Sequence, residues 1–144
     1  MPNDELYTPK FIFDALKIRF ALDVCAPAGG PLHTPADRWF SLQDDGLAQQ
    51  WEGRVWMNPP YSNPTPWVDK WIAHSNGFAL VAFSKANWFG KLWDSKAKAA
   101  RLPTNTSFIN IDGKKQQIWM PVSLWAIGES NITILKMSGL GVIR

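Results

Sequence analysis

The stretch GRVWMNPPYSNPTPW, residues 53–67, carries the clearest structural signal in the chain. It begins as a short apolar run of the kind found in buried strands and stops at two consecutive prolines, Pro59 and Pro60. Because proline fixes the φ angle and has no N–H donor, the pair ends the strand and stiffens the backbone beyond it. Asn58-Pro59-Pro60-Tyr61 is therefore predicted to be a rigid turn at the carboxyl end of a strand.

Helix and strand patterns alternate on both sides of this turn. Apolar periodicity and turn residues predict helices over 9–17, 65–75 and 88–101, with strands over 20–25, 53–58 and 77–84. Thr8 is expected to cap the first helix, and Pro9 suits its first position. The segment 26–38 holds three prolines and two glycines and is expected to be a loop.

The last third of the chain is expected to be mostly β. Further strands are predicted over 39–42, 122–128 and 132–137, and a hairpin over 106–119 turning at Asp112-Gly113. Alternating helices and buried strands followed by a β-rich tail predict an open α/β sheet in one domain, residues 1–144. The sheet is expected to be mostly parallel with an antiparallel C-terminal edge.

Composition narrows the class of protein. A hydrophobic fraction of 46% and nine tryptophans argue against disorder. No run of about eighteen apolar residues exists, so no membrane span is expected. The polar N-terminus lacks a signal-peptide pattern, which favours a cytoplasmic protein. Cys25 is the single cysteine, and His33 and His74 are isolated, so neither a disulfide nor a metal site is predicted.

Charge is distributed unevenly along the chain. Residues 1–72 carry six basic and nine acidic side chains, whereas residues 73–144 carry nine basic and three acidic ones. Several lysines of the second half lie close to aromatic residues such as Trp88, a combination that suits a polyanion with stackable bases. A solvated helix face is the alternative explanation. The candidate nucleic-acid contacts are Lys85, Trp88, Lys91, Lys96, Lys98, Lys114 and Lys115.

The Asn58–Tyr61 turn also predicts chemistry. It presents the Asn58 amide oxygen and the Pro59 carbonyl as acceptors beside the flat Tyr61 ring, an arrangement matched to a planar group bearing –NH2. Two acceptors on one amine localise its lone pair, so the nitrogen can attack an activated methyl group without a strong base. The alternative is that the four residues only end the strand.

The ordered segments LYTP, LDVCA, DDGLAQQW, VWMNPPYS and ALVAFSKANWF resemble the phage-type, Dam-like DNA N6-adenine methyltransferases. The resemblance covers almost the whole chain. It implies a Rossmann-like, S-adenosylmethionine-dependent methyltransferase sheet, shortened after the first strand and without a separate target-recognition domain. It also implies double-stranded DNA as partner, with the target adenine flipped out of the stack. No oligomeric state follows from it.

The resemblance assigns roles to particular residues. Asn58, Pro59, Pro60 and Tyr61 would hold the flipped adenine. The implied contacts to S-adenosylmethionine are Thr8, Pro9, Asp23, Cys25, Ala26 and Asp45. Each has a simpler alternative: Thr8 can be only a helix cap, Asp23 a paired strand-end carboxylate, and Asp45 a turn former. Asp44 could replace Asp45.

Some family features are missing. Gly29-Gly30 come late after the first strand, and the ribose ligand is unassigned apart from Asp37. The acidic residue expected near Lys85 is absent. Trp39 and Trp88 are the tryptophans most suited to ligand contact, with the cofactor and DNA respectively. Two other functions therefore stay open: methylation of protein glutamine amides or RNA amines, and a non-catalytic nucleic-acid-binding module that retains the fold.

Overall fold

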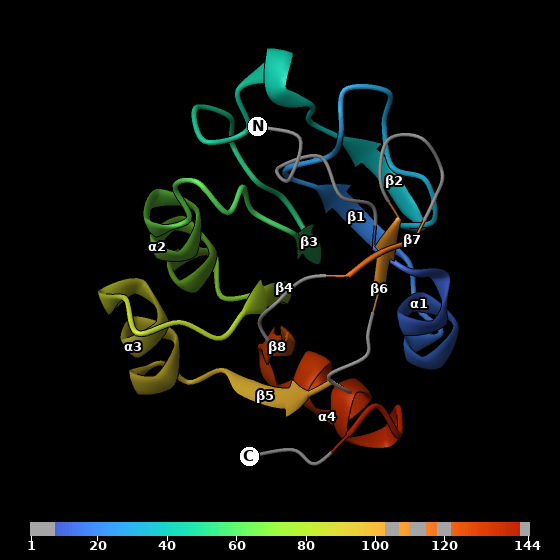
Figure 1. Cartoon of the computed structure of the whole chain (residues 1–144), viewed down its shortest axis with the longest axis vertical. Coiled ribbons are helices and arrows are strands. Elements are labelled where there is room, and N and C mark those ends of the chain that lie inside the picture. The colour runs from blue at the N-terminus through green and yellow to red at the C-terminus, as the bar shows by residue number, and fades with distance from the viewer. Residues whose placement is uncertain (1–7, 103–106, 110–114, 118–121, 142–144) are drawn as a thin grey trace.

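A six-stranded mixed sheet with helices on both faces forms the body of the molecule, which we describe from a computed structural model. The described residues are 8–102, 107–109, 115–117 and 122–141. The strand order is β2-β1-β3-β4-β8-β5 (Figure 1). In the described part of the chain, every helix is too short or too polar to cross a lipid bilayer.

The predicted strands and helices mostly form where the sequence places them. Their bounds are α1 Lys10–Leu16, β1 Phe20–Asp23, β2 Ala36–Trp39, the 3₁₀ helix η2 Leu42–Asp44, β3 Val55–Met57, α2 Thr65–His74, β4 Gly77–Ala82, α3 Asn87–Asp94, β5 Lys98–Arg101, β6 Ser107–Ile109, β7 Lys115–Gln117, β8 Val122–Ile127 and α4 Glu129–Met137. The α/β class and the mixed sheet are thus confirmed.

The direction of the strands fixes where a ligand can bind. Strands β2, β1, β3 and β4 pair in parallel, while β8 is antiparallel to both β4 and β5. The antiparallel strand is therefore one position inside the sheet, not at the edge where the sequence predicted it. Because β5 runs in the direction of the parallel strands, the carboxyl ends of all five meet at one edge, here called the carboxyl edge.

Three predicted elements were wrong. The helix expected to reach residue 101 ends at Asp94, and Lys98–Arg101 form β5 instead. Residues 132–137 belong to α4, not to a strand. Strand β2 begins at Ala36, inside the segment expected to be a loop.

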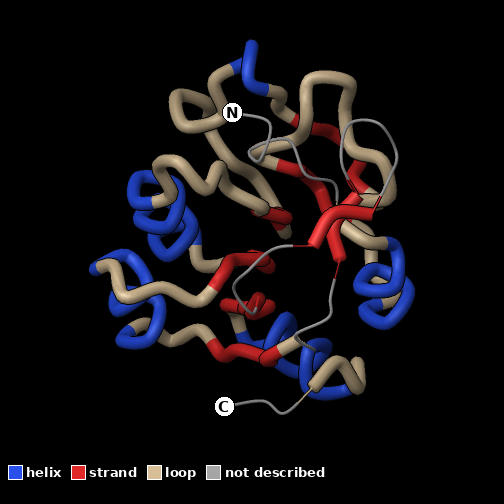
Figure 2. Tube along the Cα trace, in the orientation of Figure 1, coloured by secondary structure: helices blue, strands red, loops and turns tan. Residues whose placement is uncertain are grey.

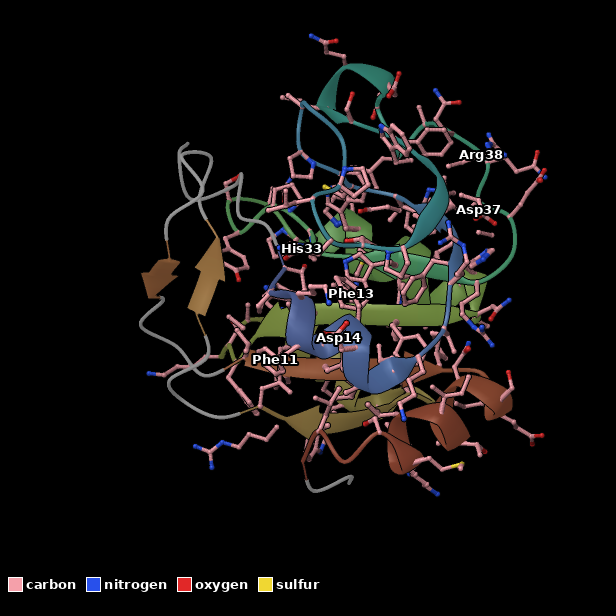
Figure 3. The ribbon with its side chains drawn as sticks, turned by 90° about the vertical axis from the view of Figure 1, so that its right-hand side faces the viewer. Phe11, Phe13, Asp14, His33, Asp37 and Arg38 are labelled. Atoms are coloured by element: carbon pink, nitrogen blue, oxygen red, sulfur yellow. The ribbon has the colours of Figure 1, made fainter. Side chains whose placement is uncertain are left out.

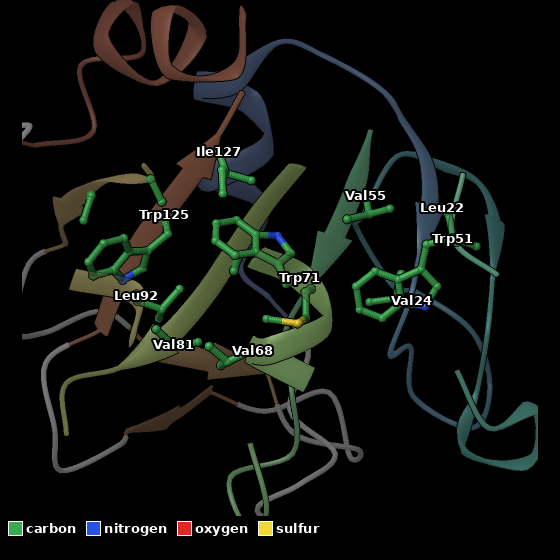
Figure 4. Packing of buried hydrophobic residues seen from close by; sticks show 14 residues of the cluster. Leu22, Val24, Trp51, Val55, Val68, Trp71, Val81, Leu92, Trp125 and Ile127 are labelled. Atoms are coloured by element: carbon green, nitrogen blue, oxygen red, sulfur yellow. The ribbon is translucent and has the colours of Figure 1, made fainter. Parts of the chain in front are cut away.

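Two apolar clusters, one on each face of the sheet, make the core. One contains Phe13, Phe20, Trp56 and Phe78 with α1 and α4. The other lies under α2 and α3 and is centred on buried Trp71 (Figure 4). Trp51, Trp56, Trp71 and Trp125 are buried in these clusters.

The hairpin β6–β7 stands outside the sheet. The two strands form a separate two-stranded sheet. They overlap the β1–β2 region in the view of Figure 2, and in the turned view of Figure 3 they project at one side. The hairpin joins the end of β5 to the start of β8, where Arg101 pairs with Ser123. It therefore emerges at the carboxyl edge. Its predicted turn, Asp112-Gly113, falls outside the described residues.

Candidate functional site

The site lies where the chain changes direction across the sheet. From β1 it leads to β2 on one side, and from β3 to β4 on the other, so β1 and β3 flank a topological switch point. Ligands of open α/β sheets bind at the carboxyl ends of the strands at such a point. Asp23 ends β1 and Asn58 follows β3, so both predicted residues stand there.

A small cavity brings four predicted site residues together. Its lining includes Thr8, Asp23, Cys25 and Asn58, with Trp56 below them. The opposite wall comes from the loop between β1 and β2, through Pro27, Pro31, Leu32 and Thr34. The cavity measures about 10 Å³, which is room for one water molecule at most.

Asp23 is the most perturbed ionisable group of the cavity. The residue is 3% exposed, and among the described residues its carboxylate accepts one hydrogen bond, from the Cys25 N–H at 3.2 Å. Burial raises the pKa of Asp23 from 3.8 to about 7, and the Cys25 hydrogen bond opposes part of that rise. Buried carboxylates are costly when they lack a cationic partner. Asp23 is thus suited to meet a positively charged group.

Thr8 lines the same cavity as this carboxylate, and its side chain does not cap the first helix. Pro9, in extended conformation, is the N-cap of α1, and no side-chain hydrogen bond caps this helix. The prediction that Thr8 is the cap was therefore wrong. Thr8 is nevertheless 5% exposed and lines the cavity, so its burial is explained by the site.

The Asn58–Tyr61 turn leads from β3 towards α2. Asn58 and Pro60 are half-buried and Pro59 is buried. The Tyr61 ring is half-buried against the α1–α4 cluster, and burial raises the pKa of its phenol. The ring is thus anchored on one side by the core, which holds the turn rigid.

Asp45 reaches the carboxyl edge from η2. It has a left-handed backbone conformation with φ 51°, and it is exposed. The next residue, Gly46, touches the end of β1: an added Cβ would stand 2.2 Å from the Val24 carbonyl oxygen. Asp44 is engaged elsewhere, since its carboxylate accepts hydrogen bonds from the backbone and hydroxyl of Ser41. Of the two acids, the geometry favours Asp45 as a ligand.

Cys25 and Ala26 continue from β1 into the loop that covers the cavity. Ala26 is buried, and its N–H donates to the Phe40 carbonyl at 2.8 Å. Residues 24–35, all of them described, contain no helix between β1 and β2, as the resemblance implied. Trp39, 47% exposed at the end of β2, covers Gly30 of this loop. Asp37 pairs with Arg19 at 2.8 Å, which leaves the ribose role without structural support.

The basic candidates do not form one surface. Lys85 follows β4 at the carboxyl edge, and Lys91 on α3 pairs with Asp69 at 3.0 Å. Lys96 and Lys98 precede or begin β5, at the opposite end of the strands from Asn58. The prediction that Lys91, Lys96 and Lys98 act together assumed one continuous helix over residues 88–101. Lys114 falls outside the described residues, and the side chain of Lys115 is not described.

Trp93 and Arg101 lie at the surface and were not among the individual DNA contacts chosen from the sequence. Trp88 packs edge-on against Phe89 at 5.6 Å and is half-buried, whereas Trp93 is 63% exposed. Trp93 lines a shallow depression of about 600 Å³ with Lys85 and Lys91. Arg101 is exposed where β5 ends at the carboxyl edge. Because residues 88–101 were predicted to be a helix, neither strand β5 nor its direction was expected from the sequence.

Comparisons with known proteins identify the family of the chain. The family model described as DNA N-6-adenine-methyltransferase (Dam) matches residues 2–118. The chain is 37% identical over 73 residues to a DNA N-6-adenine-methyltransferase of Haemophilus phage HP1, a match that covers 47% of this chain and 40% of the relative. It therefore spans less than half of that relative's length. No solved structure matches the fold. The family match includes Asp23, Asp45 and the Asn58–Tyr61 turn, and the chain belongs to the DNA N-6-adenine-methyltransferase (Dam) family.

Proposed function

We propose that this protein is a DNA adenine methyltransferase that transfers a methyl group from S-adenosylmethionine to the exocyclic amine of a flipped adenine in double-stranded DNA. The observation that carries the proposal is the shared cavity of Asp23 and Asn58 at the switch point. One residue suits the cationic end of the cofactor and the other suits the amine of the base. We also propose that the fold is the Rossmann-like sheet of such methyltransferases.

The residue chemistry fits the cofactor. Asp23 would hold the positively charged amino group, with Thr8 and Pro9 beside it. Cys25 and Ala26 would let the backbone approach, and Asp45 would accept a hydrogen bond from the adenine amine of the cofactor. When bound, S-adenosylmethionine supplies an activated methyl group. Cofactor pockets measure several hundred Å³, so the loop that contributes Pro27 and Pro31 must move outward to admit it.

The catalytic turn would act by positioning. The Asn58 side-chain oxygen and the Pro59 carbonyl accept the two N–H groups of the target amine, which localises its lone pair toward the methyl group. Transfer would form the N–CH3 bond as the S–CH3 bond of S-adenosylmethionine breaks and S-adenosylhomocysteine leaves, and the amine would then lose one proton to solvent. Tyr61 would contact the face of the base, a contact worth roughly 1–3 kcal/mol. The fixed prolines keep both acceptors in place between turnovers.

DNA would approach the carboxyl edge. The flipped base must reach Asn58, so phosphate contacts come from groups on that edge or beside it. Lys85, Arg101 and the hairpin β6–β7 meet this requirement. Lys91 and Trp88 would act at the flank, along α3. Lys96 and Lys98 remain predicted DNA contacts, but they lie at the opposite end of the strands from Asn58 and would not reach the same duplex. Lys114 and Lys115 belong to the hairpin region of the sequence.

The test is transfer of labelled methyl from S-adenosylmethionine to unmethylated duplex DNA, with the product base identified as N6-methyladenine. Asn58→Ala should lower transfer by at least a hundredfold while cofactor affinity, measured by calorimetry, changes less than about threefold. Near wild-type transfer by this variant would refute the positioning role of Asn58. Cofactor binding with no label on DNA would instead favour RNA or protein amides. Absence of both would favour a binding module.

A further inference from the structure

The segment that carries Asp45 is fastened to α2 as well as to the end of β1. Trp51 comes directly after this segment and is 6% exposed, and its indole N–H donates to the Gly46 carbonyl at 2.8 Å. The Trp51 ring stacks against Trp67 of α2, with centroids 6.4 Å apart and planes at 23°. The hydrogen bond closes the short loop between Asp45 and Trp51, and the ring contact packs this loop against α2.

Lys70 of α2 makes the polar part of this attachment. Its ammonium donates to the Leu47 carbonyl at 2.8 Å and to the Gln49 carbonyl, and it lies 5.0 Å from the centre of the Trp51 ring. An ammonium has three donors, and hydrogen bonds from charged groups are stronger than neutral ones. Lysine on a helix surface usually extends into solvent. Here it is half-buried and bonded to backbone oxygens on two residues of one loop.

We infer that Lys70 is a positioning residue for the cofactor's adenine ring: it fixes the loop 45–51 so that the Asp45 carboxylate stands at the end of β1. The inference rests on the proposed function, because it takes Asp45 to be the acceptor for the adenine amine. Lys70 itself does not reach the site. It acts through the Leu47 and Gln49 carbonyls and through Gly46, whose backbone already touches the Val24 carbonyl oxygen.

The same helix continues directly from the catalytic turn. Residues 58–64 lead into α2 at Thr65, and Lys70 lies near the middle of that helix. A single rigid element therefore supports the turn that would hold the target adenine and the loop that would hold the cofactor's adenine. Loss of Lys70 should release the loop and leave the turn in place, so the defect should be confined to cofactor recognition.

The experiment compares two product-like probes, S-adenosylhomocysteine and S-inosylhomocysteine, by calorimetry. The second probe carries an oxygen in place of the amine that Asp45 would accept from. Wild-type protein is expected to bind the adenosyl probe at least tenfold more tightly. Lys70→Met should reduce this ratio to below threefold, and Lys70→Arg, which keeps the charge, should recover part of it. Lys136→Met, on exposed α4, is the matched control and should leave the ratio unchanged.

A double-mutant cycle separates positioning from general destabilisation. In an Asp45→Ala background, Lys70→Met should change the affinity for the adenosyl probe less than twofold. A full additional loss there, or an unchanged ratio in both Lys70 variants, would overturn the inference. Wild-type protein that binds neither probe would refute the proposed function itself. Equal binding of both probes by wild type would refute the Asp45 assignment and the role of Lys70 with it.

Discussion

The buried carboxyl of Asp23 couples the chemistry of the site to the stability of the fold. Its pKa, raised to about 7, means that the folded protein holds a proton between pH 4 and 7 that the unfolded chain has already released. Stability from this group is therefore complete below pH 3.8 and is lost as the pH rises to about 7. The carboxyl group of Asp23 would bind a cation only in its ionised form. That form is the one that lowers the stability of the folded protein.

Asp23→Asn should remove this pH dependence. From the two pKa values, wild type should lose roughly 2–3 kcal/mol of unfolding free energy between pH 5 and pH 8 through this group, as an upper estimate. The amide variant should not lose it, and it should bind S-adenosylmethionine more weakly. Urea denaturation of both proteins at the two pH values is the measurement. Parallel pH profiles for the two proteins would show that the carboxyl is not buried as described.

Gly46 tests the close contact between the Asp45 loop and β1. Because an added Cβ would stand 2.2 Å from the Val24 carbonyl oxygen, Gly46→Ala should move the loop and cost about 1–3 kcal/mol of unfolding free energy. Gly90→Ala is the control, since nothing lies within 4 Å of its added Cβ and α3 should gain up to about 1 kcal/mol. Thermal or urea unfolding of the two variants measures both changes in stability. Equal effects would contradict the contact.

At the scale of elements, the amino edge of the sheet is joined to α4 by one buried amide. Asn131 is fully buried; its oxygen accepts from the Arg54 guanidinium at 2.6 Å, and its nitrogen donates to the Asn76 side chain and the Ile127 carbonyl, each at 2.8 Å. It thus links the residues before β3 and β4 to the helix that comes after β8. This edge lies opposite the site and has a structural role.

Asn131→Ala should destabilise the protein by about 2–4 kcal/mol, because it leaves Arg54 and Asn76 without their shared partner. Ser130→Ala, one residue away on the exposed side of α4, should change stability by less than about 0.5 kcal/mol. Chemical denaturation measures both. A small effect of Asn131→Ala on unfolding, comparable to that of Ser130→Ala, would mean that water replaces the amide.

The sequence predicted elements well where local signals and burial agree. The Asn58–Tyr61 turn, α2 and β4 can be predicted directly from proline placement and apolar spacing. Lys98–Arg101 could not be predicted, since alanine and lysine favour a helix and only pairing with β8 makes them a strand. In α4, Ile132, Thr133 and Ile134 favour a strand, but burial of Asn131 and Leu135 on one helix face decides.

The same limit applies to the candidate site. Thr8, Asp23 and Asn58 were predicted from motif and resemblance, and the fold brings them to one cavity. The basic residues could not be grouped correctly, because their positions depend on the direction of β5. Lys70 carried no sequence signal at all: a lysine in an amphipathic helix is ordinarily a solvated residue, and its role becomes visible only from its contacts with the Leu47 and Gln49 carbonyls.

At the scale of the whole molecule, the candidate site and the hairpin both lie at the carboxyl edge of the six-stranded sheet. The hairpin enters after Leu102 and leaves before Val122, and the strands on either side of it pair directly, Arg101 with Ser123. Ends so close can be joined by a short turn without disturbing β5 or β8. We propose that the residues between them contact DNA.

Replacing residues 103–121 by a four-residue Gly/Ser turn should separate the two activities of the edge. The shortened protein should fold, since the described residues of both apolar clusters lie outside the deleted segment, and it should bind S-adenosylmethionine within about threefold of wild type. Its affinity for duplex DNA, measured by fluorescence anisotropy at fixed salt, should fall at least tenfold, with a shallower dependence on salt because phosphate contacts are lost.

Lys136→Met, far from the hairpin in sequence and at an exposed position of α4, is the control and should keep wild-type affinity. If the shortened protein bound duplex DNA as tightly as wild type, the duplex would have to dock on Lys85 and α3 alone, and the hairpin would have no part in recognition.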